Sequence, residues 1–161
     1  MRKNPVPPEL QTTVSHVSDC CLRSFHGYQI KRTFNVIQSD LNRTLKPFDL
    51  RMITYSALVL IVDNPGLRQS QLAEAMDIER PNLVVIIDEL ERRDLIVRDR
   101  LPQDRRAYAL KATLAGRHLC DNAIAAVKVH ENRLTQGISP DALTSAMKVM
   151  QLIEANRSRE G

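Results

Sequence analysis

The sequence contains little that would support catalysis or metal binding. It has only five glycines in 161 residues, and none of them forms the glycine-rich loop that cradles phosphates. Its four histidines, at positions 16, 26, 118 and 130, show neither H-x-x-x-H nor Cys/His spacing. No nucleophile is paired with a base in a recognisable motif, although a triad built from distant residues would leave no such pattern. We predict no metal, no cofactor and no enzymatic activity.

The chain also has no apolar run near the ~18 residues that are needed to cross a bilayer. Its first ten residues, MRKNPVPPEL, include no apolar core of a signal peptide, and their prolines predict a flexible tail over residues 1–18. The three cysteines, Cys20, Cys21 and Cys120, have no C-x-x-C spacing, which favours a reducing compartment. These absences predict a soluble cytoplasmic protein without a membrane partner.

What the chain does contain is a local concentration of arginine. The net charge of +4 is mild for 161 residues, but arginines gather in one short segment, at Arg92, Arg93, Arg98, Arg100, Arg105 and Arg106. Arginine also outnumbers lysine, and its planar guanidinium suits bidentate contacts to phosphate or guanine. The cluster therefore predicts a polyanionic partner.

Apolar periodicity predicts a mainly α-helical protein of one domain. A long helix is expected from Asp19 to Lys46, where Pro47 cannot continue it. Further helices are expected over Asp49–Val62, Gln69–Asp77, Glu79–Arg93, from Thr113 to about Gln136, and after Ser139-Pro140-Asp141. Two short strands, Leu95–Arg98 and Ala107–Lys111, are expected to form a hairpin.

The order of these elements predicts a winged helix-turn-helix. Two short helices meet at the turn Asp77-Ile78, and the basic hairpin follows the second of them. Pro81 falls in the first turn of that second helix, where its missing N–H costs nothing. Asp94 stands where the chain leaves this helix, and aspartate tolerates the left-handed conformation expected there.

The segments QSQLAEAMDIERPNLVVIIDELERRDLIVR (Gln69–Arg98) and DRRAYALKATLAGR (Asp104–Arg117) resemble the MarR family of bacterial transcriptional regulators. The resemblance implies a winged helix-turn-helix with N- and C-terminal dimerisation helices, which binds a pseudo-palindromic operator in double-stranded DNA as a homodimer. On this basis residues 19–46 and 114–161 are expected to form the dimerisation region and residues 47–113 the DNA-binding domain. We expect the protein to act as a repressor.

The amino end of the recognition helix is the part expected to meet the bases. Arg80 can bind guanine and Asn82 can bind adenine, each in bidentate fashion; the alternative is a solvated helix start. Val84 and Val85 would touch thymine methyl groups if they are exposed and would only pack if they point inward. Glu79 and Arg68 replace the small capping residues that the family usually has at the starts of the two helices.

The wing resembles the family's wing in Asp104 and Arg106. The resemblance implies that Asp104 holds the loop and that one arginine points to the minor groove, while Arg100 and Arg105 are expected to contact phosphates. Arg92 and Arg93 are explained equally well as groups that bind the carbonyl end of their own helix.

Two apolar stripes at opposite ends of the chain predict a shared dimer core. One follows the first long helix, and the other follows the last helix through Leu143, Ala146, Met147, Met150 and Ile153. A homodimer would place its two recognition helices about 34 Å apart.

Members of the family commonly bind a small aromatic, often anionic, effector. Aromatic rings, an arginine and a few polar groups suit such a ligand, and the first two helices offer them at His26, Tyr28, Arg32, Asn35, Met52, Tyr55 and Ser56. We expect an aromatic acid or an aromatic acyl thioester, with ordinary helix packing as the alternative for these residues. Cys20 and Cys21 leave open a redox-sensing regulator of the same fold, and a winged-helix protein-interaction adaptor is a further alternative.

Overall fold

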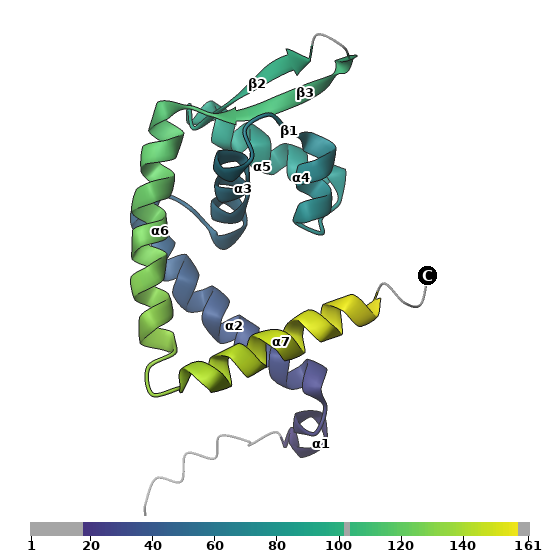
Figure 1. Cartoon of the computed structure of the whole chain (residues 1–161), viewed down its shortest axis with the longest axis vertical. Helices are drawn as coiled ribbons and strands as arrows, with labels where there is room; N and C mark the ends of the chain where they lie inside the picture. The colour runs from purple at the N-terminus through teal and green to yellow at the C-terminus, as the bar shows by residue number, and fades with distance from the viewer. Residues whose placement is uncertain (1–17, 102–103, 158–161) are drawn as a thin grey trace, which may run out of the picture. The chain divides into compact units, whose positions relative to one another are not determined.

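The structure is a computed structural model that describes residues 18–101 and 104–157, without the side chains of residues 100–101 and 104–107. The predicted N-terminal tail therefore lies almost wholly outside the described residues. Within them the chain is mainly helical and carries one small sheet (Figure 1), as predicted. The chain divides into two compact units between Asn35 and Val36.

The first unit contains α1 (Cys20–Arg23) and the beginning of α2 (His26–Leu45). The prediction of one helix over Asp19–Lys46 was wrong here, because the chain leaves the helix between Arg23 and His26. The Ser24 hydroxyl donates to the Cys21 carbonyl oxygen at 2.6 Å, a local bond of the kind that competes with helix continuation.

The second unit contains the end of α2 and all later elements. They are the 3-10 turn η1 (Lys46–Phe48), α3 (Met52–Asp63), β1 (Leu67–Arg68), α4 (Gln69–Ala75), α5 (Arg80–Arg92), β2 (Ile96–Leu101), β3 (Asp104–Ala112), α6 (Leu114–Leu134) and α7 (Pro140–Arg157). Helix α2 thus ends at Leu45, and Pro47 lies inside the following 3-10 turn.

The sheet has the order β1-β3-β2, and both pairings are antiparallel. Strands β2 and β3 form the predicted hairpin, but both are longer than predicted, and their register is irregular between Arg100 and Leu101. Strand β1 was not predicted, since two residues are too short to show an alternating pattern. It forms because Leu67 pairs with Leu110 on a strand that is distant in sequence.

A core of aliphatic side chains holds the second unit together. The buried side chains come from the end of α2 and from α3, α4, α5, the sheet and α6, and the largest are Leu45, Leu58, Ile61, Leu72, Leu83, Ile87, Leu90, Ile96 and Leu110. Each such side chain stabilises the fold by roughly 1.5–3 kcal/mol relative to an exposed position. Consequently α5 is fixed along the face that carries Leu83, Ile87 and Leu90.

The chain turns sharply between α5 and β2. Asp94 has φ 54°, which confirms the left-handed conformation predicted for it, and the Leu95 N–H donates to the Leu90 carbonyl oxygen at 3.0 Å. Thr113 begins α6 beside this turn, since its hydroxyl donates to the Asp94 carbonyl oxygen and accepts the N–H of Gly116 at 2.9 Å. The start of the wing and the start of α6 are therefore locked together.

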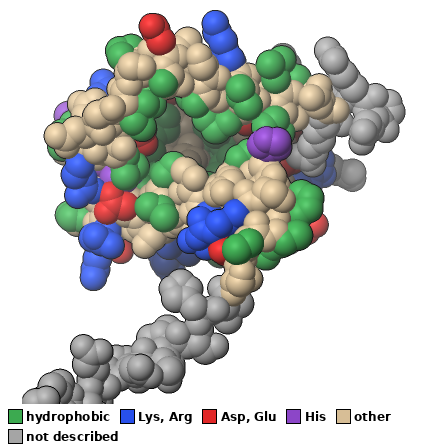
Figure 2. Space-filling view, turned by 90° about the horizontal axis from the view of Figure 1, so that it is seen from below, with side chains coloured by type: hydrophobic (Ala, Val, Ile, Leu, Met, Phe, Trp, Pro, Cys, Tyr) green, Lys and Arg blue, Asp and Glu red, His purple; other side chains and the backbone are tan. Residues whose placement is uncertain are grey.

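Apolar side chains remain open to solvent at both ends of the chain. On α7, Met147 is 57% exposed and Leu152 is 64% exposed, and Phe25 before α2 is 59% exposed. Hydrophobic side chains are also visible at the surface on the face drawn in Figure 2. On α2 only the carboxyl end of the predicted stripe, Leu41 and Leu45, is buried.

Candidate DNA interface

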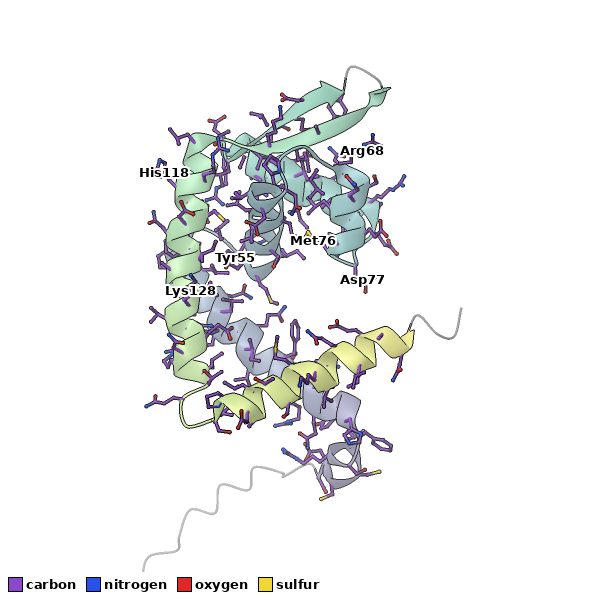
Figure 3. The ribbon with its side chains drawn as sticks, viewed as in Figure 1. Tyr55, Arg68, Met76, Asp77, His118 and Lys128 are labelled. Carbon is purple, nitrogen blue, oxygen red and sulfur yellow. The ribbon has the colours of Figure 1, made fainter. Side chains whose placement is uncertain are left out.

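Helices α4 and α5 form the helix-turn-helix. After α4, Asp77 takes φ 50° and the Ile78 N–H donates to the Ala73 carbonyl oxygen at 3.1 Å, which closes a tight turn. Arg68 and Asp77 lie at the two ends of α4 (Figure 3). Arg68 does not cap α4 with its side chain; instead its backbone N–H donates to Gln71 Oε1 at 3.0 Å.

The first two turns of α5 present an open face. Arg80 and Asn82 are exposed at the amino end, while Leu83 on the opposite side is buried. Val84 is 43% exposed and Val85 is 65% exposed, so the packing alternative for these two valines does not hold in this chain. The exposed face combines a guanidinium, an amide and two methyl-bearing side chains, which is a suitable set for reading base edges.

The beginning of α5 has no side-chain cap. Glu79 occupies the capping position in extended conformation without a side-chain bond to the helix, and Pro81 lies in the first turn. The missing N–H of Pro81 reduces the number of unsatisfied donors at this end. The helix start is therefore left open beside Arg80.

The hairpin carries one arginine that is already engaged within the protein. Arg98 forms ion pairs with Asp88 and Glu91 of α5, and its Nε lies 3.0 Å from Glu91 Oε2. Further along the strands, Lys111 Nζ lies 2.8 Å from Asp99 Oδ2. Arg98 therefore fastens β2 to the recognition helix and is not free to bind phosphate.

The predicted DNA-contacting residues of the wing lie at its tip. Arg100 is in β2, and Asp104, Arg105 and Arg106 are in β3. Their side chains lie outside the described part of the structure, so the roles expected for them stay predictions. Their backbone places all four at the end of the hairpin that is remote from α6.

The two arginines at the end of α5 differ. Arg93 donates to the carbonyl oxygens of Asp49 and Phe48, at 2.5 and 3.0 Å. Of the two interpretations left open for Arg93, the one in which it binds the carbonyl end of its own helix does not hold, because its guanidinium reaches the connection before α3. Arg92 is exposed, and its side chain forms no ion pair with the described residues.

The effector residues expected on α2 lie in the first unit, where two of them, Tyr28 and Arg32, contact Asp19. Tyr28 Oη donates to Asp19 Oδ2 at 3.0 Å, and Arg32 Nη1 lies 3.3 Å from the same oxygen. The Arg23 guanidinium, hydrogen-bonded at 2.8 Å, holds the pKa of the Asp19 carboxyl below its usual value. The Arg32 guanidinium also lies 5.8 Å from the ring centre of Tyr28.

The remaining candidates of that set, His26 and Asn35, are exposed. On α3, in the second unit, Met52, Tyr55 and Ser56 are partly buried. Burial raises the pKa of the Tyr55 phenol, and the Ser56 hydroxyl donates to the Met52 carbonyl oxygen at 2.9 Å. A pocket formed by both groups of residues stays a prediction, because they belong to different units.

The three cysteines lie in different environments. Cys20 and Cys21 are exposed in α1, where the Ser18 hydroxyl donates to Cys20 Sγ at 3.1 Å. Cys120 is fully buried in α6, and burial raises the pKa of its thiol to about 11. Cys120 is therefore a core residue.

Sequence reasoning missed two connections between distant segments. Asp40 on α2 forms an ion pair with Arg133 on α6 and lies 3.2 Å from Nε2 of the buried His130. Arg51 before α3 lies 2.6 Å from Glu89 on α5. No local pattern could have revealed either contact, since the partners are separated by dozens of residues.

The described residues contain neither a group suited to hold a metal ion nor a membrane-spanning helix. No group of three or more His, Cys, Asp or Glu side chains among them is arranged to hold a metal ion. No helix within residues 18–101 and 104–157 is long and apolar enough to span a membrane.

Known proteins resemble both the winged segment and nearly the whole chain. The MarR family model matches residues 50–108. A putative transcriptional regulatory protein for the hcr operon of Thauera aromatica is 50% identical over 62 residues, which are 38% of this chain and 37% of that protein. The match thus spans little more than a third of the length of that curated relative.

The similarity to solved structures is more extensive. The transcriptional repressor CouR, bound to a 23-mer DNA duplex, superposes with a TM-score of 0.82 at 33% identity over 87% of this chain and 99% of that chain. CouR from Rhodococcus jostii RHA1, bound to p-coumaroyl-CoA, gives 0.74 and 31% over 82% and 93%. A MarR-family regulator from Rhodococcus sp. RHA1 gives 0.77 and 31% over 84% and 96%. The chain belongs to the MarR family of transcriptional regulators.

Proposed function

We propose that this protein is a dimeric repressor that binds a pseudo-palindromic operator and is released by an aromatic acyl thioester or a related aromatic acid. The observation that carries the DNA-binding part is the exposed face of α5, where Arg80, Asn82, Val84 and Val85 are open to solvent beside the basic hairpin. Such a regulator acts on the chromosome, so we place its action in the cytoplasm.

In this proposal the recognition helix reads bases and the wing binds the backbone. Arg80 contacts guanine and Asn82 contacts adenine, while Val84 and Val85 approach thymine methyl groups. Arg100 and Arg105 contact phosphates, Arg106 enters the minor groove, and Asp104 holds the loop. The structure of CouR, which is 33% identical to this chain, has been solved with the protein bound to a 23-mer DNA duplex, and this supports the same use of the fold here.

The dimer is proposed from the uncovered apolar side chains. Those on α7 and on the amino-terminal part of α2 are too numerous for a helix that faces only water, and a second copy of the chain would cover them. Residues 19–46 and 114–161 would then supply the dimerisation region, and residues 47–113 the DNA-binding domain. Sedimentation equilibrium at micromolar concentration tests this, and a monomer there contradicts it.

The effector class is proposed from Tyr28 and Arg32 together with the relatives. An aromatic ring beside a guanidinium suits an aromatic, anionic ligand. In the first unit the Arg32 guanidinium forms an ion pair with the carboxylate of Asp19. An anionic ligand would have to compete with that carboxylate for Arg32. CouR has been crystallised with p-coumaroyl-CoA. On this basis the pocket would be formed by His26, Tyr28, Arg32, Asn35, Met52, Tyr55 and Ser56.

Duplex binding at different salt concentrations tests the DNA-binding proposal. A probe from the region upstream of the protein's own gene should lose ~10³-fold or more in affinity between about 50 and 200 mM salt, if a dimer neutralises about six phosphates. An adaptor that does not bind DNA would show no such dependence. Adding aromatic acyl-CoA thioesters or the free acids to the complex then tests the effector, and unchanged binding with all of them contradicts that part.

A second candidate, a redox-sensing regulator of the same fold, is favoured by the exposure of Cys20 and Cys21. An exposed thiol can be oxidised by peroxide and can thereby alter the first unit. Peroxide should then weaken operator binding in the natural protein but not in a variant with both residues changed to serine. Equal behaviour of the two proteins excludes this candidate.

A further inference from the structure

The connection between α2 and α3 is fastened to the carboxyl-terminal half of α5 from two sides. Arg93 donates from Nη1 to the carbonyl oxygen of Asp49 at 2.5 Å and from Nη2 to that of Phe48 at 3.0 Å. Its Nε also lies 3.8 Å from Asp49 Oδ2. From the other side, Arg51 Nη2 donates to Glu89 Oε2 at 2.6 Å, one helical turn before Arg93.

These contacts hold a connection that includes a left-handed residue. Asp49 has φ 52°, a conformation that costs most residues with a Cβ atom some energy but that aspartate tolerates better than most. Neighbouring carbonyl groups point toward the guanidinium of Arg93, which is 22% exposed although it is charged. A planar fork with two donors matches two carbonyl oxygens, whereas the single ammonium group of lysine does not.

The same helix carries the residues that are proposed to read bases. Arg80 and Asn82 lie at the amino end of α5, about 20 Å and about 17 Å from Arg93 along a helix that rises ~1.5 Å per residue. Leu83, Ile87 and Leu90 bury one side of α5 along most of its length, so a shift at one end of this regular helix is expected to carry the other end with it. Fixing its carboxyl-terminal half therefore fixes the direction in which Arg80 and Asn82 point.

We propose that Arg93 is a positioning residue for DNA recognition. By holding the carbonyl groups of Phe48 and Asp49, it joins the recognition helix to the end of α2, so that a displacement of α2 changes how Arg80 and Asn82 meet the operator. This inference rests on the proposed function and adds the route by which α2 acts on the DNA-reading face. Arg93 is then unavailable to DNA phosphates, although it belongs to the arginine cluster of the sequence.

The first test concerns the full-length protein without DNA. Arg93→Met removes both donors and keeps a long side chain, and it should raise the amide exchange rate of residues 46–51 about tenfold or more, because the connection opens more readily. Arg93→Lys keeps the charge but not the two donors of the planar guanidinium, and it should give an intermediate increase in the amide exchange rate. This variant keeps the inference testable if the methionine variant folds poorly. Arg92→Met removes the same charge one residue away and should change nothing in this segment. Unchanged exchange in both Arg93 variants overturns the inference.

The second test compares an upstream duplex with the same duplex in scrambled order. For Arg93→Met the ratio of the two affinities should fall about 2- to 30-fold, while the slope of affinity against salt stays as in the natural protein. If the substitution only destabilises the protein, the concentration of active protein falls equally for both duplexes and the ratio of the affinities stays unchanged. An unchanged ratio therefore overturns the inference. A slope reduced by about one per protomer makes Arg93 a phosphate contact and overturns it too. If the natural protein does not distinguish the duplexes, the proposed function itself fails.

Discussion

Arg98 Nε lies 3.0 Å from Glu91 Oε2, which joins the first strand of the wing to the recognition helix. Arg98 also forms an ion pair with Asp88, and its own side chain is only 21% exposed. One guanidinium thus holds two neighbouring carboxylates on α5. The angle between the wing and the helix depends on this contact as well as on the apolar core.

Arg98→Met should destabilise the fold by about 1 kcal/mol, because two carboxylates three residues apart on α5 lose the counter-charge that they share. Lys111→Met is the matched control on the same hairpin. It breaks the pair with Asp99, in which both side chains are about half exposed, and should cost no more than about 0.5 kcal/mol. Urea denaturation at one fixed protomer concentration measures both, and equal effects would contradict a special role of Arg98.

Arg80→Ala should weaken operator binding by about 1–3 kcal/mol and relax specificity at one base pair, because an exposed arginine at the start of the recognition helix can bind guanine in bidentate fashion. Titration of a set of duplexes with single substitutions measures this. Uniform weakening on every duplex would instead identify Arg80 as a phosphate contact. Arg92→Ala, which removes an exposed arginine from the other end of the helix, serves as the control.

Gly116→Ala should destabilise the protein by about 1–3 kcal/mol, since a Cβ atom there would lie 2.0 Å from the Leu95 carbonyl oxygen. The beginning of α6 would have to move away from the start of β2. Gly27→Ala is the control of opposite sign: nothing lies within 4 Å of its Cβ position, and alanine in a helix is favoured by about 0.5–1 kcal/mol. Thermal and urea unfolding compare the two, and a stable Gly116→Ala variant would contradict the close approach.

Cys120 should stay unreactive in the native protein. Its thiol is buried and its pKa is raised to about 11, so about 0.1% is thiolate at pH 8. A disulfide reagent should therefore titrate two thiols, Cys20 and Cys21, before denaturation and a third only afterwards. Three reactive thiols in the folded protein would contradict the burial of Cys120.

The same raised pKa has a consequence for stability. The unfolded chain releases the Cys120 proton near its ordinary value of 9.0, whereas the folded chain keeps it to about 11. The contribution of the neutral thiol is therefore fully present below about pH 9 and is lost as the pH rises toward 11. Cys120→Ala should show a smaller loss of stability across this window than the natural protein does.

The pattern of residues within short segments predicted those elements whose structure is set by residues close to them in sequence. The apolar spacing of α5 predicted its existence and its buried side, and Asp94 predicted the left-handed turn after it. The break before α2 was missed, because a single hydroxyl bond at Ser24 overrides an otherwise continuous apolar repeat. Strand β1 was missed because its pairing depends on β3, which lies more than forty residues away.

The sequence alone determined the family resemblance, the helix-turn-helix, the basic hairpin and the exposed start of the recognition helix, since these follow from periodicity, turn residues and charge within short segments. Only the tertiary structure decided which arginines remain available for DNA. Arg93 and Arg98 are bound within the protein, Arg80 is exposed, and Val84 and Val85 face solvent. The physical reason is that a guanidinium binds whichever carboxylate or carbonyl group the folded chain brings within reach, and those partners are set by packing between segments that are distant in sequence.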